Sequence, residues 1–166
     1  MMLSLGFGSG LPYILLISTT SAWLRDAGVE LSLIGFFAWI TFAYTIKFIW
    51  APLVDRFSVP YFARYGHRKS WIALMQIIII SALLLLSNID PIQSFLFFCI
   101  VAGLIAFAGS FQDIAIDAFR IEYAHISDQG NLAAAYQLGY RLAIIAATSL
   151  ALIFADSNGW SLTYKL

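Results

Sequence analysis

The fold is decided by residues 92–112, whose sequence IQSFLFFCIVAGLIAFAGSFQ contains no charged side chain. A helix needs about 20 mostly apolar residues to cross the hydrocarbon core of a bilayer, and this stretch has that length and character. Four further windows are similarly apolar, with at most one charge each: residues 3–23, 33–54, 71–88 and 132–155. The sequence therefore predicts an all-α integral membrane protein with five transmembrane helices.

The composition supports this class and argues against several others. Hydrophobic residues make up 61% of the chain and charged residues only 11%, whereas a soluble domain has about 25% charged residues. The net charge is zero, so no basic surface for nucleic acid is expected. The sequence contains no GxSxG, HExxH or Walker motif, and its single cysteine supports neither a disulfide framework nor a metal cluster. We expect neither an enzyme nor a bound cofactor.

The distribution of positive charge predicts an orientation. Most cations lie in the connections that follow the second and fourth windows, namely Arg56, Arg64, Arg68, Lys69 and Arg120, whereas Arg25 and Lys165 lie on the other side. Loops rich in Lys and Arg stay in the cytoplasm, so a cytoplasmic N-terminus is predicted. Trp23, Trp50, Trp71 and Trp160 lie near window ends, where indole rings favour the headgroup region.

Two cations lie deep inside apolar windows, Lys47 in the second and Arg141 in the fifth. Such a charge at the centre of a membrane helix costs about 2.5–3.5 kcal/mol on insertion scales, so it is expected to face the protein interior or a water-filled cavity. Tyr44 accompanies Lys47, and Gln137 and Tyr140 accompany Arg141. These groups suit an anionic ligand. The alternative is that both cations pair with acidic groups elsewhere in the bundle, including Asp113.

A second polar group follows the fourth window, where Asp113 and Asp117 lie one turn apart if the helix continues. Two carboxylates near a low-dielectric boundary do not both ionise easily. Arg120 is placed to neutralise Asp117, which makes Asp113 the candidate for a reversible proton site. The alternative is a solvated helix end with ordinary ion pairs.

Small residues predict where helices approach one another closely. Gly6 and Gly10 form a small-xxx-small pair in the first window, and Pro12 can open the backbone hydrogen-bond ladder there. This pattern fits either close packing or a bent, cavity-lining helix. In the fourth window, residues Ala102, Ala106 and Ser110 form a packing seam.

The connection after the second window combines Asp55 and Arg56 with a later basic cluster, residues 66–69, sequence GHRK. Membrane topology alone accounts for basic residues here. Alternatively, ion pairs among Asp55, Arg56 and Arg68 act as a latch that forms in one transport state only.

Together these motifs resemble the major facilitator superfamily, and within it the AmpG-type muropeptide permeases, with acetyl-CoA transporters as more distant relatives. Residues 55–56 and 66–69 resemble the loop between the second and third helices of that superfamily, with His67 at a usual arginine position. The narrower matches are residues 5–12, 22–25, 47–56, 112–118 and 138–141. The resemblance covers nearly the whole chain.

The resemblance implies a proton-coupled permease of the bacterial inner membrane that imports anhydro-muropeptides for cell-wall recycling. Protons are then the coupling ion, and Gln112 and Asp113 are the residues it marks as important for transport. Family members need two six-helix halves, whereas a sixth segment only begins at residues 159–164. We therefore expect a partial N-terminal half whose remaining helices come from a C-terminal continuation or a separate chain. Two alternatives are a transporter of another anionic solute, such as an acyl-CoA or a peptide, and a truncated or split gene product inactive on its own.

Overall fold

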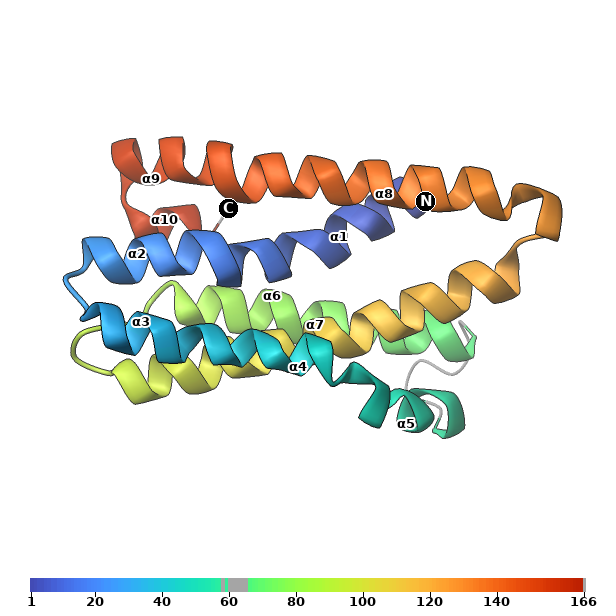
Figure 1. Cartoon of the computed structure of the whole chain (residues 1–166), viewed down its shortest axis with the longest axis horizontal. Helices are drawn as coiled ribbons and strands as arrows, with labels where there is room; N and C mark the ends of the chain where they lie inside the picture. The colour runs from blue at the N-terminus through green and yellow to red at the C-terminus, as the bar shows by residue number, and fades with distance from the viewer. Residues whose placement is uncertain (58, 60–65, 166) are drawn as a thin grey trace.

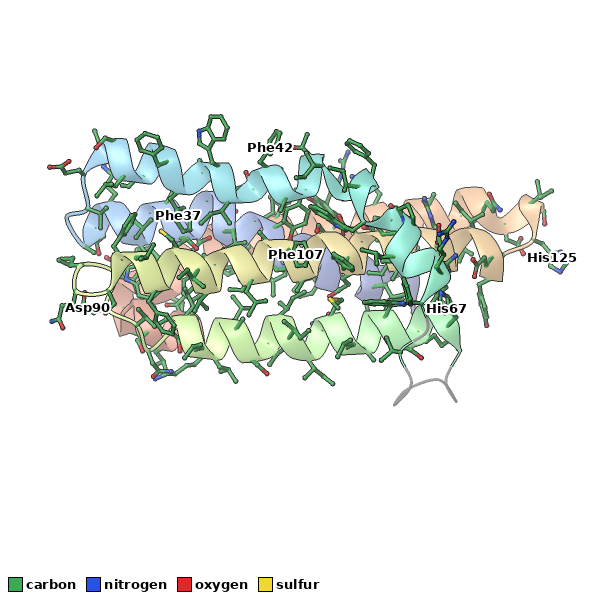
Figure 2. All side chains as sticks on the ribbon, turned by 90° about the horizontal axis from the view of Figure 1, so that it is seen from below. Phe37, Phe42, His67, Asp90, Phe107 and His125 are labelled. Atoms are coloured by element: carbon green, nitrogen blue, oxygen red, sulfur yellow. The ribbon has the colours of Figure 1, made fainter. Side chains whose placement is uncertain are left out.

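The computed structural model describes residues 1–57, 59 and 66–165, so Arg64 lies outside the described residues. Within those residues, five helical segments are long and apolar enough to cross a membrane: Met2–Asp26, Leu31–Ile49, His67–Leu86, Phe95–Tyr123 and Ile126–Asn158. Figure 1 shows them side by side as an elongated bundle. Figure 2 places His67 and His125 toward one end and Asp90 at the other, as expected for successive membrane crossings.

Three of these segments are composite. The first consists of α1 (Met2–Ile14), the π-helical η1 (Leu15–Thr19) and α2 (Thr20–Asp26). The second consists of α3 (Leu31–Phe37), η2 (Ala38–Thr41), α4 (Phe42–Thr45) and η3 (Lys47–Ile49), and α5 (Ala51–Arg56) follows it. The third and fourth are the single helices α6 (His67–Leu86) and α7 (Phe95–Tyr123). The fifth consists of η5 (Ile126–Asp128), α8 (Gln129–Ile145), η6 (Ala146–Leu150) and α9 (Ala151–Asn158), and α10 (Trp160–Thr163) follows it.

Helices α1 and α8 pack closely because glycines line their contact. A methyl group on Gly6 would collide with the main-chain carbonyl of Tyr136, and one on Gly139 would collide with the carbonyl of Leu3. At Gly10 a methyl carbon would lie 2.9 Å from the ring of Tyr140. Gly6 and Gly10 therefore serve close helix packing.

Pro12 opens the hydrogen-bond ladder of α1, as predicted. Proline has no N–H, so the carbonyl of Gly8, one turn earlier, loses its helical donor. The side-chain amide of Gln112 on α7 replaces it, with 3.3 Å between Gln112 Nε2 and Gly8 O. The π-helical turn at Leu15–Thr19 follows within the next turn, and the Thr19 hydroxyl donates to the carbonyl of Ala147 in the π-helical η6.

The second segment is broken near its end instead of running as one helix through residue 54. Ile46 and Trp50 leave helical geometry, with φ and ψ of −93° and 12° and of −101° and 0°. Pro52 fits the break at Trp50, since it cannot donate to Phe48 and lies in the first turn of α5, where no helical donor is needed. Lys47 consequently lies in the short η3 turn.

The fourth helix is longer than its apolar window, since α7 continues to Tyr123. Asp113 and Asp117 therefore do lie one turn apart on one helix. The predicted seam of Ala102, Ala106 and Ser110 is fully buried, at 0% exposure. Trp23 differs from the prediction: its indole is buried against Phe98, with ring centroids 5.2 Å apart, so it faces the protein interior instead of headgroups.

Candidate functional site

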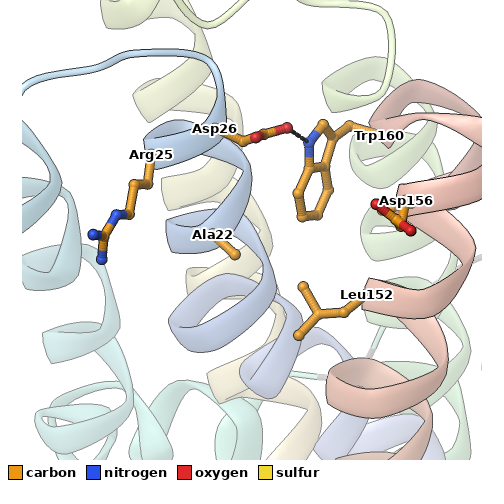
Figure 3. Close-up of a pocket in the computed structure, with 7 residues that line it drawn as sticks. Ala22, Arg25, Asp26, Leu152, Asp156 and Trp160 are labelled. Atoms are coloured by element: carbon orange, nitrogen blue, oxygen red, sulfur yellow. Dashed lines mark hydrogen bonds between the residues drawn. The ribbon is translucent and has the colours of Figure 1, made fainter.

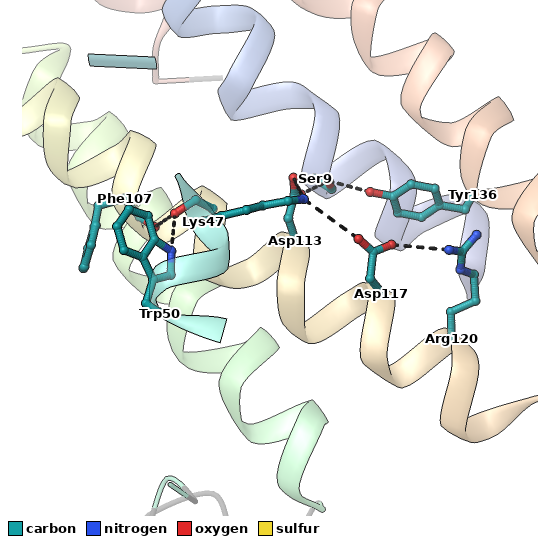
Figure 4. A network of polar contacts seen from close by, with 9 residues as sticks. Ser9, Lys47, Trp50, Phe107, Asp113, Asp117, Arg120 and Tyr136 are labelled. Atoms are coloured by element: carbon teal, nitrogen blue, oxygen red, sulfur yellow. Dashed lines mark hydrogen bonds and ion pairs between the residues drawn. The ribbon is translucent and has the colours of Figure 1, made fainter. Parts of the chain in front are cut away.

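Four charged side chains from η3 and α7 form a central cluster. Lys47 Nζ lies 3.5 Å from Asp113 Oδ2 and 3.9 Å from Asp117 Oδ2. Arg120 pairs with the other oxygen of Asp117 at 3.5 Å. The Asp113 side chain is 17% exposed, against 35% for Lys47 and 44% for Asp117. Figure 4 shows the central cluster as a continuous row, in which two cations balance two carboxylates.

Two hydroxyl groups complete the surroundings of Asp113. Ser9, which is 2% exposed on α1, donates to Asp113 Oδ1, and the Tyr136 hydroxyl of α8 lies 2.8 Å from Ser9 Oγ (Figure 4). Since the Ser9 proton points to the carboxylate, Tyr136 is the donor in the second bond. Asp113 on α7 is thus linked to α1 through Ser9, to α8 through Tyr136 and to η3 through Lys47.

Aromatic side chains hold the second segment against α7. The Trp50 indole donates to Ser110 Oγ at 3.1 Å and stacks on Phe111, with centroids 5.8 Å apart. The Tyr44 hydroxyl projects against Gly109, where a methyl group would collide with it. That hydroxyl is buried without a hydrogen-bond partner among the described residues, and the Tyr44 ring packs edge-on against Tyr13 at 4.7 Å. These contacts fix the position of Lys47 in η3.

Gln112 neighbours Asp113 in sequence but serves a different contact. It is 1% exposed and faces α1, where it donates to Gly8 as described above. Its Oε1 atom is buried and has no partner among the described residues. The structure therefore places the Gln112 side chain between α7 and α1.

The three polar residues that the sequence groups on α8, Gln137, Tyr140 and Arg141, also lie in different surroundings. The Tyr140 ring packs over Gly10 on α1, whereas Gln137 and Arg141 are exposed. Among the described residues, Arg141 forms no ion pair with any carboxylate. Of the two membrane-embedded cations, only Lys47 is joined to the central cluster.

At the end of the bundle marked by His67, a second group of ion pairs centres on Arg68. Its guanidinium lies 2.7 Å from Asp55 and 2.8 Å from Glu122, and thereby joins the ends of α5, α6 and α7. The His67 ring also lies 2.7 Å from the carbonyl oxygen of Val54. Arg56 is exposed and has no ion pair within the described part of the chain. The predicted pairing of Asp55 is thus with Arg68.

An open pocket of about 490 Å³ lies at the opposite end of the bundle, between α2, α9 and α10. Figure 3 shows Trp160 across its mouth, where the indole donates to Asp26 at 2.8 Å. Arg25 lies on the side of α2 away from Trp160, and Asp156 faces the pocket from α9. No polar contact among the described residues joins this pocket to the central cluster.

Sequence reasoning did not identify Ser9, Tyr136 or Glu122 as site residues. For two of them a signal exists: Tyr136 and Tyr140 are spaced four apart on one helix, as are Gly6 and Gly10 on another. Matching bulky and small residues at that spacing suggests facing helices. Ser9, inside the glycine-rich stretch, is then brought close to Tyr136.

Comparisons with known proteins identify the family. A family described as acetyl-coenzyme A transporter 1 matches residues 1–160. The chain is 35% identical to the putative transporter AmpG 4 of Rickettsia conorii, over 96% of this chain and 39% of that protein. It is 37% identical to the anhydromuropeptide permease of Escherichia coli K12, over 99% of this chain and 33% of that protein.

The chain therefore spans about a third to two-fifths of the length of the curated relatives it matches. Its five helices correspond to part of the N-terminal half of a major facilitator fold. The match to the family covers nearly all of the described residues, including the central cluster and the Arg68 ion pairs. The chain belongs to the acetyl-coenzyme A transporter family of multi-pass membrane transporters, and over the same helices it is similar to the AmpG and anhydromuropeptide permease relatives.

Proposed function

We propose that this chain is part of a proton-coupled transporter that imports anhydro-muropeptides across the bacterial inner membrane for cell-wall recycling. The observation that carries the proposal is the position of Lys47 between Asp113 and Asp117. Lys47 is held by carboxylates of the protein, yet it is still 35% exposed. A ligand carboxylate can therefore compete with Asp113 for it.

The charge balance of the central cluster links proton binding to anion binding. With both aspartates ionised, Lys47 and Arg120 leave the cluster neutral. A proton on Asp113 leaves one uncompensated positive charge, which is costly at membrane depth unless an anion arrives. Proton and anion thus stabilise each other's binding, and this linkage is reciprocal. Such linkage is what a symporter of protons and anions requires.

The identity of the anion rests on the relatives. One relative bears the name anhydromuropeptide permease, and muropeptides carry peptide carboxylates. The family description names acetyl-coenzyme A, which is also anionic, so an acyl-CoA is the second candidate. We expect the other wall of the pathway to come from helices outside this chain, whether C-terminal or on a separate chain.

We also propose a cytoplasmic N-terminus, from the distribution of cations between the two ends of the bundle. Arg68, Lys69 and Arg120 lie toward the end of the bundle where α1 begins, together with the exposed Arg56. This concentration of cations supports a cytoplasmic location for that end. Asp55, Arg68 and Glu122 would then form a latch on the cytoplasmic side, whose ion pairs hold α5, α6 and α7 together in one transport state.

Uptake of labelled anhydro-muropeptide into permease-null cells that express the complete gene tests this proposal. We expect uptake that increases as the external pH falls, while Asp113→Asn retains ligand binding but loses its pH dependence. Labelled acetyl-CoA, supplied to membrane vesicles, tests the second candidate. Transport of acetyl-CoA alone would exclude the muropeptide assignment, and unchanged proton coupling in Asp113→Asn would refute the role of Asp113.

A further inference from the structure

We propose that Ser9 and Tyr136 form the proton relay that serves Asp113, an inference that rests on the proposed proton coupling. The Ser9 hydroxyl donates to Asp113 Oδ1, and the Tyr136 hydroxyl lies 2.8 Å from Ser9 Oγ. The donors are aligned in one direction, from Tyr136 through Ser9 to the carboxylate. Figure 4 shows this line crossing from α8 over α1 to α7.

The two oxygens of Asp113 have different surroundings, and this difference favours the hydroxyl side as the proton's route. Lys47 lies 3.5 Å from Oδ2, so an incoming hydronium ion on that side would approach a positive charge. Oδ1 is instead contacted by Ser9, which is neutral and 2% exposed. A proton can reach Oδ1 through the hydroxyls without passing the ammonium group.

The transfer balances without any change in the two relay residues. A hydronium ion at the Tyr136 hydroxyl gives its proton to the phenol oxygen, the phenol proton passes to Ser9 Oγ, and the Ser9 proton passes to Asp113 Oδ1. Three O–H bonds form and three break, the hydronium becomes water, and Asp113 becomes a neutral carboxylic acid. Tyr136 and Ser9 are neutral before and after the transfer.

The charged and titratable groups around this route are compatible with it. Lys47 from η3, Asp117 and Arg120 from α7, Tyr44 from α4 and Tyr140 from α8 surround Asp113 and the relay. The Arg120 guanidinium carbon lies 5.8 Å from the centroid of the Tyr136 ring. Because the phenol passes one proton on as it takes up another, Tyr136 carries no net charge beside this cation before or after the transfer.

The test uses the complete transporter reconstituted in vesicles, with Tyr136→Phe and Ser9→Ala as the relay variants. Proton-driven uptake is compared with substrate exchange at equal pH, which needs a folded binding site but no net proton movement. We expect both variants to lose proton-driven uptake by about tenfold or more, as for removal of an acid–base group, while exchange is retained. Ser9→Thr, which keeps the hydroxyl, is expected to keep proton-driven uptake.

Matched controls are Ser21→Ala, whose hydroxyl bonds to its own helix at Ile17, and Tyr123→Phe, an exposed residue at the end of α7. Neither is expected to change coupling. Wild-type proton-driven uptake in Tyr136→Phe and Ser9→Ala would overturn the relay, and so would an equal loss of uptake and exchange, or a loss in Ser9→Thr. The result for Asp113→Asn is independent: if that variant remains coupled, the proposed function fails, whatever the relay variants do.

Discussion

The bond between Gln112 and Gly8 predicts a specific energetic coupling between two positions on different helices. Gln112 donates to a carbonyl that has no helical donor, because Pro12 stands where the donor would be. Replacing Gln112 with Met removes this donor at nearly constant side-chain volume. Replacing Pro12 with Ala supplies a backbone N–H to the same carbonyl.

The expected magnitude follows from the burial of the contact. Gln112 is 1% exposed but Gly8 is only partly buried, so the Gly8 carbonyl loses its donor in a partly buried site. An unsatisfied buried acceptor costs about 1–3 kcal/mol, and we expect the lower end of that range, about 1 kcal/mol, here. In the Pro12→Ala background the carbonyl is already satisfied, so Gln112→Met should cost less by about that amount.

The assay is a double-mutant cycle on the full-length protein, with the free energy of unfolding measured by titration with a denaturing detergent. Gln76→Met on α6 is the control: its amide oxygen approaches Gly8, but it donates no hydrogen bond to that carbonyl. If Gln112→Met costs the same free energy with proline as with alanine at position 12, the assignment of Gln112 as the donor that compensates for Pro12 is wrong.

Two further predictions concern packing and the Arg68 ion pairs. Gly6→Ala should lower the free energy of unfolding by about 1–3 kcal/mol, because the new methyl meets a backbone carbonyl that cannot rotate away. Gly103→Ala, which meets nothing within 4 Å, is its control, and equal stability of the two variants would contradict the α1–α8 contact. Arg68→Gln should slow or abolish uptake while exchange at equal pH persists, and exchanging the charges in Arg68→Glu with Glu122→Arg should partly restore uptake. Failure of the exchanged pair to improve on Arg68→Glu alone would argue against the latch.

Much of the fold follows from the sequence because membrane helices are defined by length and composition. Residues 92–112 and 71–88 could not form anything else with so few polar groups. The break near Trp50 was less predictable, since Pro52 gives the reason but not the turn at which the helix yields. The position of the break is linked to a long-range contact, because the Trp50 indole donates a hydrogen bond to Ser110 on α7.

The central cluster was predictable only in part, for a related reason. Asp113, Asp117 and Arg120 share one helix, so their spacing alone places them together. Ser9 and Asp113 are 104 positions apart, and Ser9 and Tyr136 are 127 positions apart. Contacts at such separations depend on how the helices are rotated about their axes, which a single sequence does not encode in any local pattern. Gln112 shows the consequence, since the rotation of α7 about its axis turns this side chain toward α1.

The two embedded cations differ in a way that bears on mechanism. Lys47 has its neutralising charges on α7, so the cost of placing it at membrane depth is met within these helices. Arg141 has no carboxylate partner within the described residues and is exposed on α8. A guanidinium in a membrane segment still requires an anionic or water-filled environment. If its environment is anionic, we expect the counter-charge to come from the proposed anionic substrate or from residues outside the described part of the chain. The variant Arg141→Lys distinguishes these two sources, because it keeps the charge but loses bidentate binding. A weaker affinity for the anion with unchanged stability indicates that Arg141 contacts the ligand. A loss of stability alone indicates a structural ion pair.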